Sequence, residues 1–144
     1  MKGTTMRNLT QPDLALLAFA REAQEKAYSP YSGFRVGAAV YANGDIFQGV
    51  NVENAAYGAT ICAERSAISA AVSAGCLDVT AIAIVGASET PTVPCGCCRQ
   101  VLAEFNPEMR VIMGGNGDEV RVMSLDELLP EAFVRGFLDS DESK

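Results

Sequence analysis

The side chains of this 144-residue chain best suited to chemistry are cysteines that could hold a metal ion. Cys95 and Cys98 have the C-x-x-C spacing, which lets the opening turn of one helix offer two sulfurs to one metal, and Cys62 opens an earlier helix-like segment. A structural zinc site takes four protein ligands, whereas a catalytic site takes three and leaves one position for water. Three thiolates therefore predict one catalytic Zn²⁺ ion per chain.

The chain has two further cysteines, and neither is expected to reach the metal. Cys97 lies about 100° round the helix from Cys98, so its thiol is predicted to point away. Cys76 lies roughly 20 Å along the axis of the helix that Cys62 opens. A purely structural zinc module would need one of these thiols as a fourth ligand. A thioredoxin-like redox protein would use the C-x-x-C pair as its reactive thiols, which leaves Cys62 without a role.

Glu64 is the predicted general acid and base. The sequence has no histidine, so proton transfer must fall to a carboxylate, thiol, tyrosine or lysine. Glu64 stands two residues after Cys62 in the same opening turn, close enough to contact a water molecule that the metal activates. We expect its carboxylate to take a proton from that water and to return it to the substrate.

The negative charge of the thiolates must be stabilised by nearby positive charge. Three thiolates around Zn²⁺ leave one net negative charge, which opposes ionisation of a bound water. We expect two helix N-termini to offset it, because their free N–H groups and positive dipole ends stabilise negative charge. Arg65, three residues after Cys62 on the same helix face, is predicted to donate a charge-assisted hydrogen bond to a ligand sulfur.

Alternating helices and strands must position these side chains. Periodicity and capping residues, such as Thr10 with Asp13, predict four helices, at residues 10–28, 62–74, 95–105 and 124–130. β-branched runs and turn signals such as Asn43-Gly44 predict strands, as a hairpin over 34–51, a buried strand over 79–86 and a second hairpin over 110–123. This order predicts an α/β fold in one domain over residues 1–144. We expect a three-layer α-β-α sandwich with a five-stranded mixed sheet.

Composition narrows the class of protein. The net charge is −7 and the last residues include Asp139, Asp141 and Glu142, so we expect no binding to a phosphate backbone and hence no nucleic acid partner. The sequence has neither a signal-peptide core nor an apolar run of roughly 20 residues, which predicts no membrane association. Cysteines crowded at CGCC suit a reducing compartment, and we expect a cytoplasmic protein.

The motifs strongly resemble those of the small homotetrameric, zinc-dependent cytidine deaminases. The C-A-E-R segment at 62–65 and the P-C-G-x-C-R-Q segment at 94–100 match the family, as do YSPYSGFRVGAA and NVENAAYGATICAERSA. The resemblance runs over residues 14–133, with Cys97 at the variable position x. It implies a cytidine deaminase-like fold, hydrolytic deamination of cytidine and deoxycytidine with release of ammonia, and a homotetramer with shared active sites.

The resemblance also assigns substrate-binding residues. It implies that Asn51 and Glu53 grip the ribose hydroxyls, since an amide and a carboxylate offer donors and acceptors to adjacent hydroxyls. Phe34 corresponds to the phenylalanine that packs on the pyrimidine. The remaining positions help to close the pocket, partly across a subunit boundary: Ala55, Tyr57, Ala63 and Phe133.

Two other deaminase substrates have to be weighed. Deaminases that act on nucleotides, tRNA or DNA generally show an H-A-E or H-x-E pattern where this chain has Cys62. A deaminase of a cytosine-nucleoside antibiotic, of the blasticidin type, is the alternative closest to the motifs. Phe34, Asn51 and Glu53 favour ordinary cytidine and deoxycytidine.

Overall fold

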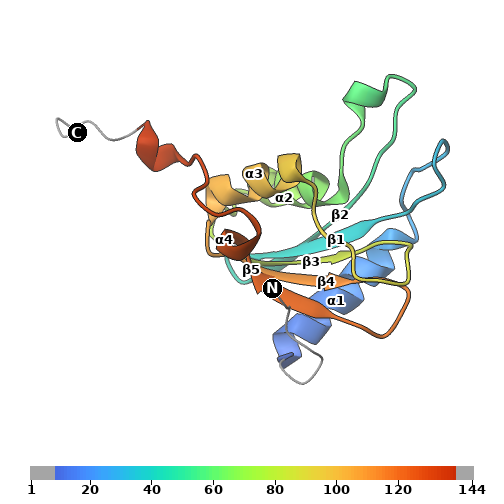
Figure 1. The fold of residues 1–144 in the computed structure, drawn as a ribbon, viewed down its shortest axis with the longest axis horizontal. Coiled ribbons are helices and arrows are strands. Elements are labelled where there is room, and N and C mark those ends of the chain that lie inside the picture. Colours follow the sequence, from blue (N-terminus) through green and yellow to red (C-terminus); the bar gives the residue numbers. More distant parts are fainter. Residues whose placement is uncertain (1–8, 139–144) are drawn as a thin grey trace.

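A five-stranded mixed sheet forms the centre of the computed structural model, which describes residues 9–138 (Figure 1). The strands are β1 (Gly37–Ala42), β2 (Asp45–Val50), β3 (Val79–Val85), β4 (Arg110–Gly114) and β5 (Arg121–Ser124). Their spatial order is β2-β1-β3-β4-β5, with β3 and β4 parallel and the other pairs antiparallel. Three acidic residues of the sequence lie outside the described residues, namely Asp139, Asp141 and Glu142.

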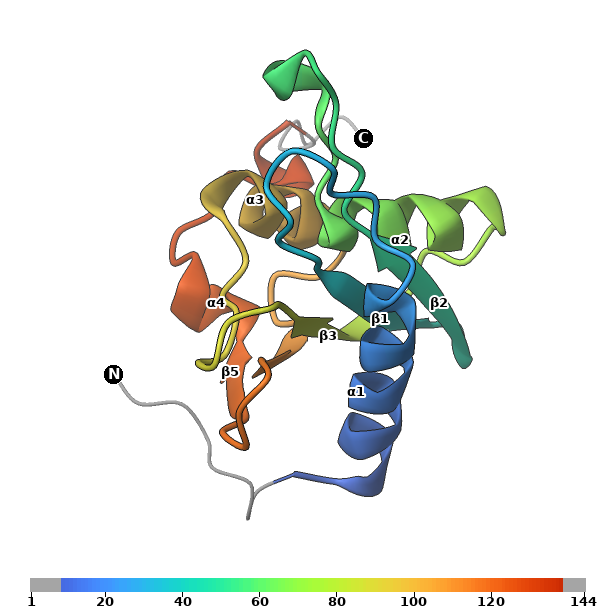
Figure 2. The same cartoon turned by 90° about the vertical axis from the view of Figure 1, so that its right-hand side faces the viewer.

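Helices cover both faces of the sheet, which confirms the predicted three-layer sandwich. They are α1 (Gln11–Gln24), α2 (Ala63–Ser73), α3 (Gly96–Phe105) and α4 (Leu125–Leu128), with 3₁₀ turns η2 (Tyr57–Ala59) and η3 (Arg135–Phe137). Helix α1 packs on one face, and α2, α3 and α4 pack on the other (Figures 1 and 2). No helix within residues 9–138 is long and apolar enough to cross a bilayer.

Apart from Thr80, which is exposed, strand β3 is buried on both sides, as its largely apolar sequence predicts. Ile82 and Ile84 face the core under α2 and α3, whereas Ala83 and Val85 face the core under α1. Because side chains alternate along a strand, one run of apolar residues fills two separate cores. The small alanines on the α1 side let that helix approach the sheet.

The two hairpins and the capping boxes form much as predicted. Asn43 and Gly44 both have positive φ, 53° and 85°, in a two-residue turn that pairs Ala42 with Asp45, as an Asn-Gly hairpin requires. The Thr10 hydroxyl accepts from the Asp13 N–H, and the Asp13 carboxylate accepts from the Thr10 N–H. The same carboxylate is paired with Arg110 of β4 at 2.7 Å, a contact that the sequence did not indicate.

The first helix is shorter than predicted, because α1 ends at Gln24 and not at Tyr28. Tyr28 instead forms a bridge with Val52: its N–H donates to the Asn51 carbonyl at 3.0 Å, and its carbonyl accepts from the Glu53 N–H at 2.9 Å. The first hairpin also starts later, at Gly37, so residues 29–36 form a loop next to the segment that follows β2. Tertiary pairing overrides helical propensity here.

The backbone of helix α2 lies directly against β2 at Gly49, which has no side chain. A Cβ atom at this position would lie 2.6 Å from the Ala63 carbonyl oxygen and still closer to the Ala67 N atom. Both are backbone atoms of the first turns of α2, so the helix itself would have to move. The first turn of α2 therefore depends on glycine at position 49.

We expect Gly49→Ala to lower the free energy of unfolding by about 1–3 kcal/mol, the usual cost of overpacking. Chemical denaturation of the variant and the parent protein measures the difference. Gly58→Ala is the matched control, since its Cβ would meet no atom within 4 Å. Equal stability of the Gly49 and Gly58 variants would contradict the close approach of α2.

Candidate active site

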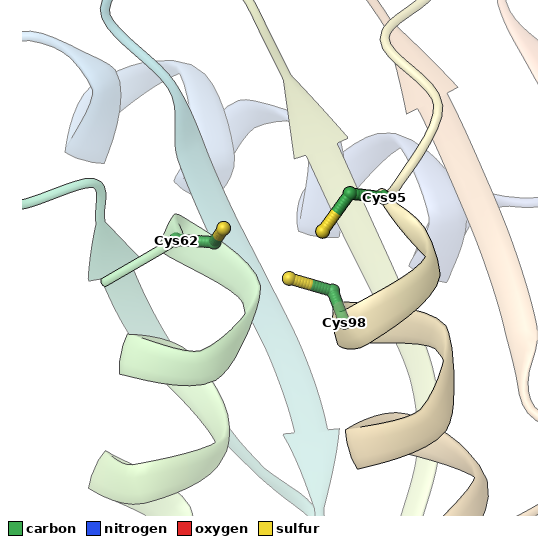
Figure 3. A group of neighbouring side chains, drawn as sticks. All are labelled: Cys62, Cys95 and Cys98. Atoms are coloured by element: carbon green, nitrogen blue, oxygen red, sulfur yellow. The ribbon is translucent and has the colours of Figure 1, made fainter. Parts of the chain in front are cut away.

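Three cysteine sulfurs meet where α2 and α3 begin (Figure 3). Cys62 is the N-cap residue of α2, Cys95 is the N-cap residue of α3, and Cys98 lies in the first turn of α3. Their Sγ atoms all lie within 4.8 Å of one another. Among the residues that the structure describes, this is the one group of three or more cysteine, histidine or acidic side chains able to share a metal ion.

The thiol cluster fits zinc in donor type, number and spacing. Two sulfurs bound to one tetrahedral zinc ion at about 2.3 Å lie about 3.8 Å apart, so only small side-chain adjustments are needed from the observed spacing. Cys98 is fully buried and Cys62 half-buried, whereas Cys95 is exposed. Three thiolates at a partly open edge form a site with room for one further ligand.

The other two cysteines lie outside the cluster. Cys97 is exposed, although it is next to Cys98 in the first turn of α3. Cys76 follows the C-terminal end of α2 and packs at the margin of the core. Neither thiol belongs to the group of three, so no fourth cysteine completes a structural site.

The surroundings of Cys62 favour its thiolate form. Hydrogen bonding with Cys98 lowers the pKa of Cys62 to about 6 against the opposing effect of burial, and Cys95 and Arg65 contribute in the same direction. The same interaction with Cys62 raises the pKa of the Cys98 thiol. The hydrogen bond between the two thiols thus favours the thiolate at Cys62 and the protonated thiol at Cys98.

Glu64 is buried beside the thiols, with 5% of its surface exposed. Burial raises the pKa of Glu64 to about 7, and the charge of Cys62 acts in the same direction. A carboxyl group with such a pKa is present in both protonation states near neutral pH, which suits a group that both accepts and donates a proton. Its place in the first turn of α2 fixes it next to Cys62.

Arg65 lies beside Cys62 and links the site to the preceding loop. Its charge and hydrogen bonding lower the pKa of Cys62, and its Nη2 donates to the Thr60 carbonyl at 3.0 Å. The guanidinium therefore stabilises the thiolate and holds the end of the loop that leads into α2.

Asn51 has a structural role that the sequence did not reveal. Its side chain is 8% exposed; the Oδ1 atom accepts from the Val36 N–H at 2.9 Å, and the Nδ2 atom donates to the Phe34 carbonyl at 2.8 Å. These bonds fix residues 34–36 against the end of β2. Asn51 thereby sets the position of Phe34, which is partly exposed.

Glu53 closes the loop over residues 29–33. Its Oε1 atom accepts from the N–H groups of Tyr31 and Ser32 at 3.0 and 3.1 Å, and the Ser32 hydroxyl donates to Oε2. The Ser32 hydroxyl is the main cause that lowers the pKa of Glu53. Glu53 and its neighbours border a hollow of about 260 Å³, lined by Tyr31, Ser32, Glu53, Asn54, Tyr57 and Thr60.

The structure places the remaining predicted residues in different surroundings. Ala63 is fully buried and packs in the core, whereas Ala55 is exposed. Tyr57 is 79% exposed, and Phe133 is 59% exposed and stacks on Phe137 with ring centroids 5.4 Å apart. Within one chain, these aromatic side chains are largely uncovered.

Comparison with known proteins identifies the family. A family model for the "Cytidine and deoxycytidylate deaminase zinc-binding region" matches residues 10–114. A cytidine deaminase of Halalkalibacterium halodurans is 47% identical over 121 residues, covering 83% of this chain and 92% of that protein. A crystal structure of cytidine deaminase from Burkholderia pseudomallei matches with a TM-score of 0.81 at 47% identity, covering 87% of this chain and all of the other. The chain belongs to the cytidine and deoxycytidylate deaminase family, which confirms the resemblance seen in the sequence.

A more distant relative bears on the choice of substrate. Blasticidin-S deaminase of Bacillus cereus is 32% identical over 137 residues, covering 89% of this chain and 96% of that protein. Its identity is well below the 47% of the cytidine deaminase from Halalkalibacterium halodurans. The comparison therefore favours a cytidine deaminase over an antibiotic deaminase.

We expect the purified protein to contain one zinc ion per chain, because three thiols at two helix N-termini form a preorganised soft site. Cys62→Ala, Cys95→Ala and Cys98→Ala should each abolish stoichiometric zinc, as measured by elemental analysis. Cys97→Ala is the matched control and should retain it. Loss of zinc from the Cys97 variant with retention in the Cys98 variant would contradict the ligand assignment.

Proposed function

We propose that the protein is a zinc-dependent cytidine deaminase, acting as a single domain. The reaction adds water to C4 of cytidine or deoxycytidine and releases ammonia, giving uridine or deoxyuridine. The observation that carries the proposal is a buried carboxylate, Glu64, next to three clustered thiols. The 47% identity to a cytidine deaminase supports the choice of substrate.

The thiolates of Cys62, Cys95 and Cys98 hold one zinc ion per chain. A zinc ion in such a site supplies Lewis-acid activation of a water molecule at neutral pH. Arg65 and the N-terminal ends of α2 and α3 stabilise the negative charge of the thiolates. The protein thereby limits the charge that would otherwise oppose loss of a proton from water.

Glu64 moves the protons of the reaction. Its carboxylate accepts a proton from the attacking water and donates it to the ring nitrogen of the pyrimidine. It then carries the second water proton to the amino group, which leaves as ammonia. A pKa raised to about 7 by burial lets the same group act in both directions.

The substrate is held by the loops before α2. Asn51 and Glu53 bind the ribose hydroxyls. They use the donor and acceptor positions that are not occupied by their hydrogen bonds to residues 31–36. Phe34 packs on the pyrimidine ring. Ala63, whose side chain is buried, contributes through its backbone.

Charge and thiol chemistry bear on where the protein acts. With a net charge of −7, the surface favours a small nucleoside over nucleic acid. We place the enzyme in the cytoplasm, where a reducing environment keeps ligand cysteines available for metal. A cytosine-nucleoside antibiotic is the second candidate substrate, because of the 32% identity to blasticidin-S deaminase. Comparing kcat/KM for cytidine and blasticidin S decides between the two.

We expect the zinc-loaded protein to deaminate cytidine, as followed by the ultraviolet change and by ammonia release. Glu64→Gln should keep the fold and the zinc ion but lower kcat by about 10⁴-fold or more, because one residue serves several proton transfers and no histidine can replace it. Absence of turnover by the zinc-loaded parent protein would refute the function. Near-normal turnover by the variant would remove Glu64 from its role.

The exposed aromatic residues support an assembly with composite active sites, for which the sequence motifs predict a homotetramer. The C-terminal segment that carries Phe133 and Phe137 leads away from the sandwich, and the loop that carries Tyr57 projects beyond α2 (Figure 1). Large aromatic side chains exposed in this way gain most from burial against another chain. We propose that Phe133 packs beside the substrate of a neighbouring subunit, with Ala55 and Tyr57 at the same boundary.

Mixing two inactive variants tests this arrangement. When Glu64→Ala and Phe133→Ala chains are dissociated and reassembled together, we expect partial recovery of activity, because some pockets combine an intact Glu64 with the intact Phe133 of a neighbour. Each variant reassembled alone is the control. Composite sites would be excluded if light scattering showed that the active protein is a monomer. They would also be excluded if chains shown to co-assemble recovered no activity.

A further inference from the structure

Arg99 of α3 connects the metal-binding turn to the C-terminal part of the chain. Its Nε atom donates to the Pro94 carbonyl at 2.8 Å, and its Nη1 atom donates to the Leu128 carbonyl at 2.6 Å. Pro94 directly precedes Cys95, and Leu128 is the last residue of α4. The half-buried guanidinium therefore joins two segments that are far apart in the sequence.

The segment before Cys95 is held in part by the Thr92 N–H, which donates to the Gly114 carbonyl at 3.0 Å, and by the burial of Pro91 and Pro94. It runs Pro91-Thr92-Val93-Pro94, and the two prolines carry no N–H group to donate. Cys95 itself is exposed, so little side-chain packing fixes its sulfur. In the first turn of α3, the Cys95 carbonyl accepts from the Arg99 N–H at 3.0 Å. Backbone and side chain of Arg99 thus hold two consecutive carbonyl groups on either side of the Cys95 Cα atom.

The same helix also anchors the segment beyond α4. The neighbouring Gln100 donates through Nε2 to the Phe133 carbonyl at 2.7 Å. Arg99 at Leu128 and Gln100 at Phe133 therefore tie both ends of residues 128–133 to α3. A planar guanidinium with several fixed donors can hold two carbonyls at once, which a lysine ammonium on a flexible stem does poorly.

We propose that Arg99 is a positioning residue that holds Cys95 in place for zinc and ties that position to the C-terminal segment. Arg99 acts through the Pro94 and Leu128 carbonyls. Gln100 shares the second task only. The part that concerns the C-terminal segment rests on the proposed function, whereas the part that concerns zinc does not.

Zinc release to an excess of a colorimetric chelator measures the first task without any substrate. Arg99→Met keeps a long apolar stem but removes the donors, and we expect it to release zinc about 10- to 100-fold faster, as for the loss of other groups that orient metal ligands. Arg99→Lys should fall between this variant and the parent protein. Arg121→Met is the matched control, because Arg121 pairs only at the surface, with Glu119, and it should release zinc at the parental rate.

Steady-state kinetics measure the second task. Gln100→Ala should release zinc at the parental rate but raise KM for cytidine about fivefold, the effect of losing one hydrogen bond. Arg99→Met should change both quantities. The different effects of the two variants on zinc release and KM distinguish Arg99 from a residue that only supports folding. Thermal unfolding of each variant measures its stability.

Three outcomes would overturn the inference. The first is that a folded Arg99→Met protein releases zinc at the parental rate. The second, if the Met variant does not fold, is that Arg99→Lys releases zinc at the parental rate. The third is that Gln100→Ala releases zinc as fast as Arg99→Met. Zinc release in the expected order from a protein that does not turn over cytidine would instead refute the proposed function and leave the role of Arg99 intact.

Discussion

The meeting of two helix N-termini on one face of the sheet is the constraint on which the site depends. Helices α2 and α3 begin side by side, and each carries a cysteine at its N-cap position (Figure 3). Their free N–H groups and dipoles favour negative charge at this place, which three thiolates require. Gly49 lets α2 lie against β2, and β3 lies in the same sheet between β1 and β4. The position of the three thiols thus depends on the packing of α2 and α3 against the sheet.

Features that depend on neighbouring residues are predictable from the sequence. Helix openings at Cys62 and Cys95, the Asn43-Gly44 turn and the doubly buried β3 follow from neighbouring residues, and the structure contains them all. The resemblance to family motifs also predicts substrate-binding roles, which composition and spacing cannot show. Those roles stay predictions.

Contacts between distant parts of the chain were missed. Tyr28 leaves the helical pattern because it pairs with the segment after β2, and Asp13 is both a capping residue and the partner of Arg110. Asn51 and Glu53 hold the loop of residues 29–36 through backbone groups. Bonds of this kind, from a side chain to a remote backbone, leave no periodicity and no spacing in the sequence. They become visible only when the fold brings the partners together.

The order of the three thiols along the chain has a consequence for folding. Between Cys62 and Cys95 lie α2 and β3, the middle strand of the sheet. A metal ion shared by these thiols closes a loop in the chain around that strand. Closing such a loop lowers the conformational entropy of the unfolded ensemble, much as a disulfide does, and stabilises the fold by about 4 kcal/mol for a loop of a few tens of residues. The bound ion then acts as a reversible cross-link, so that its removal lowers the stability of the fold.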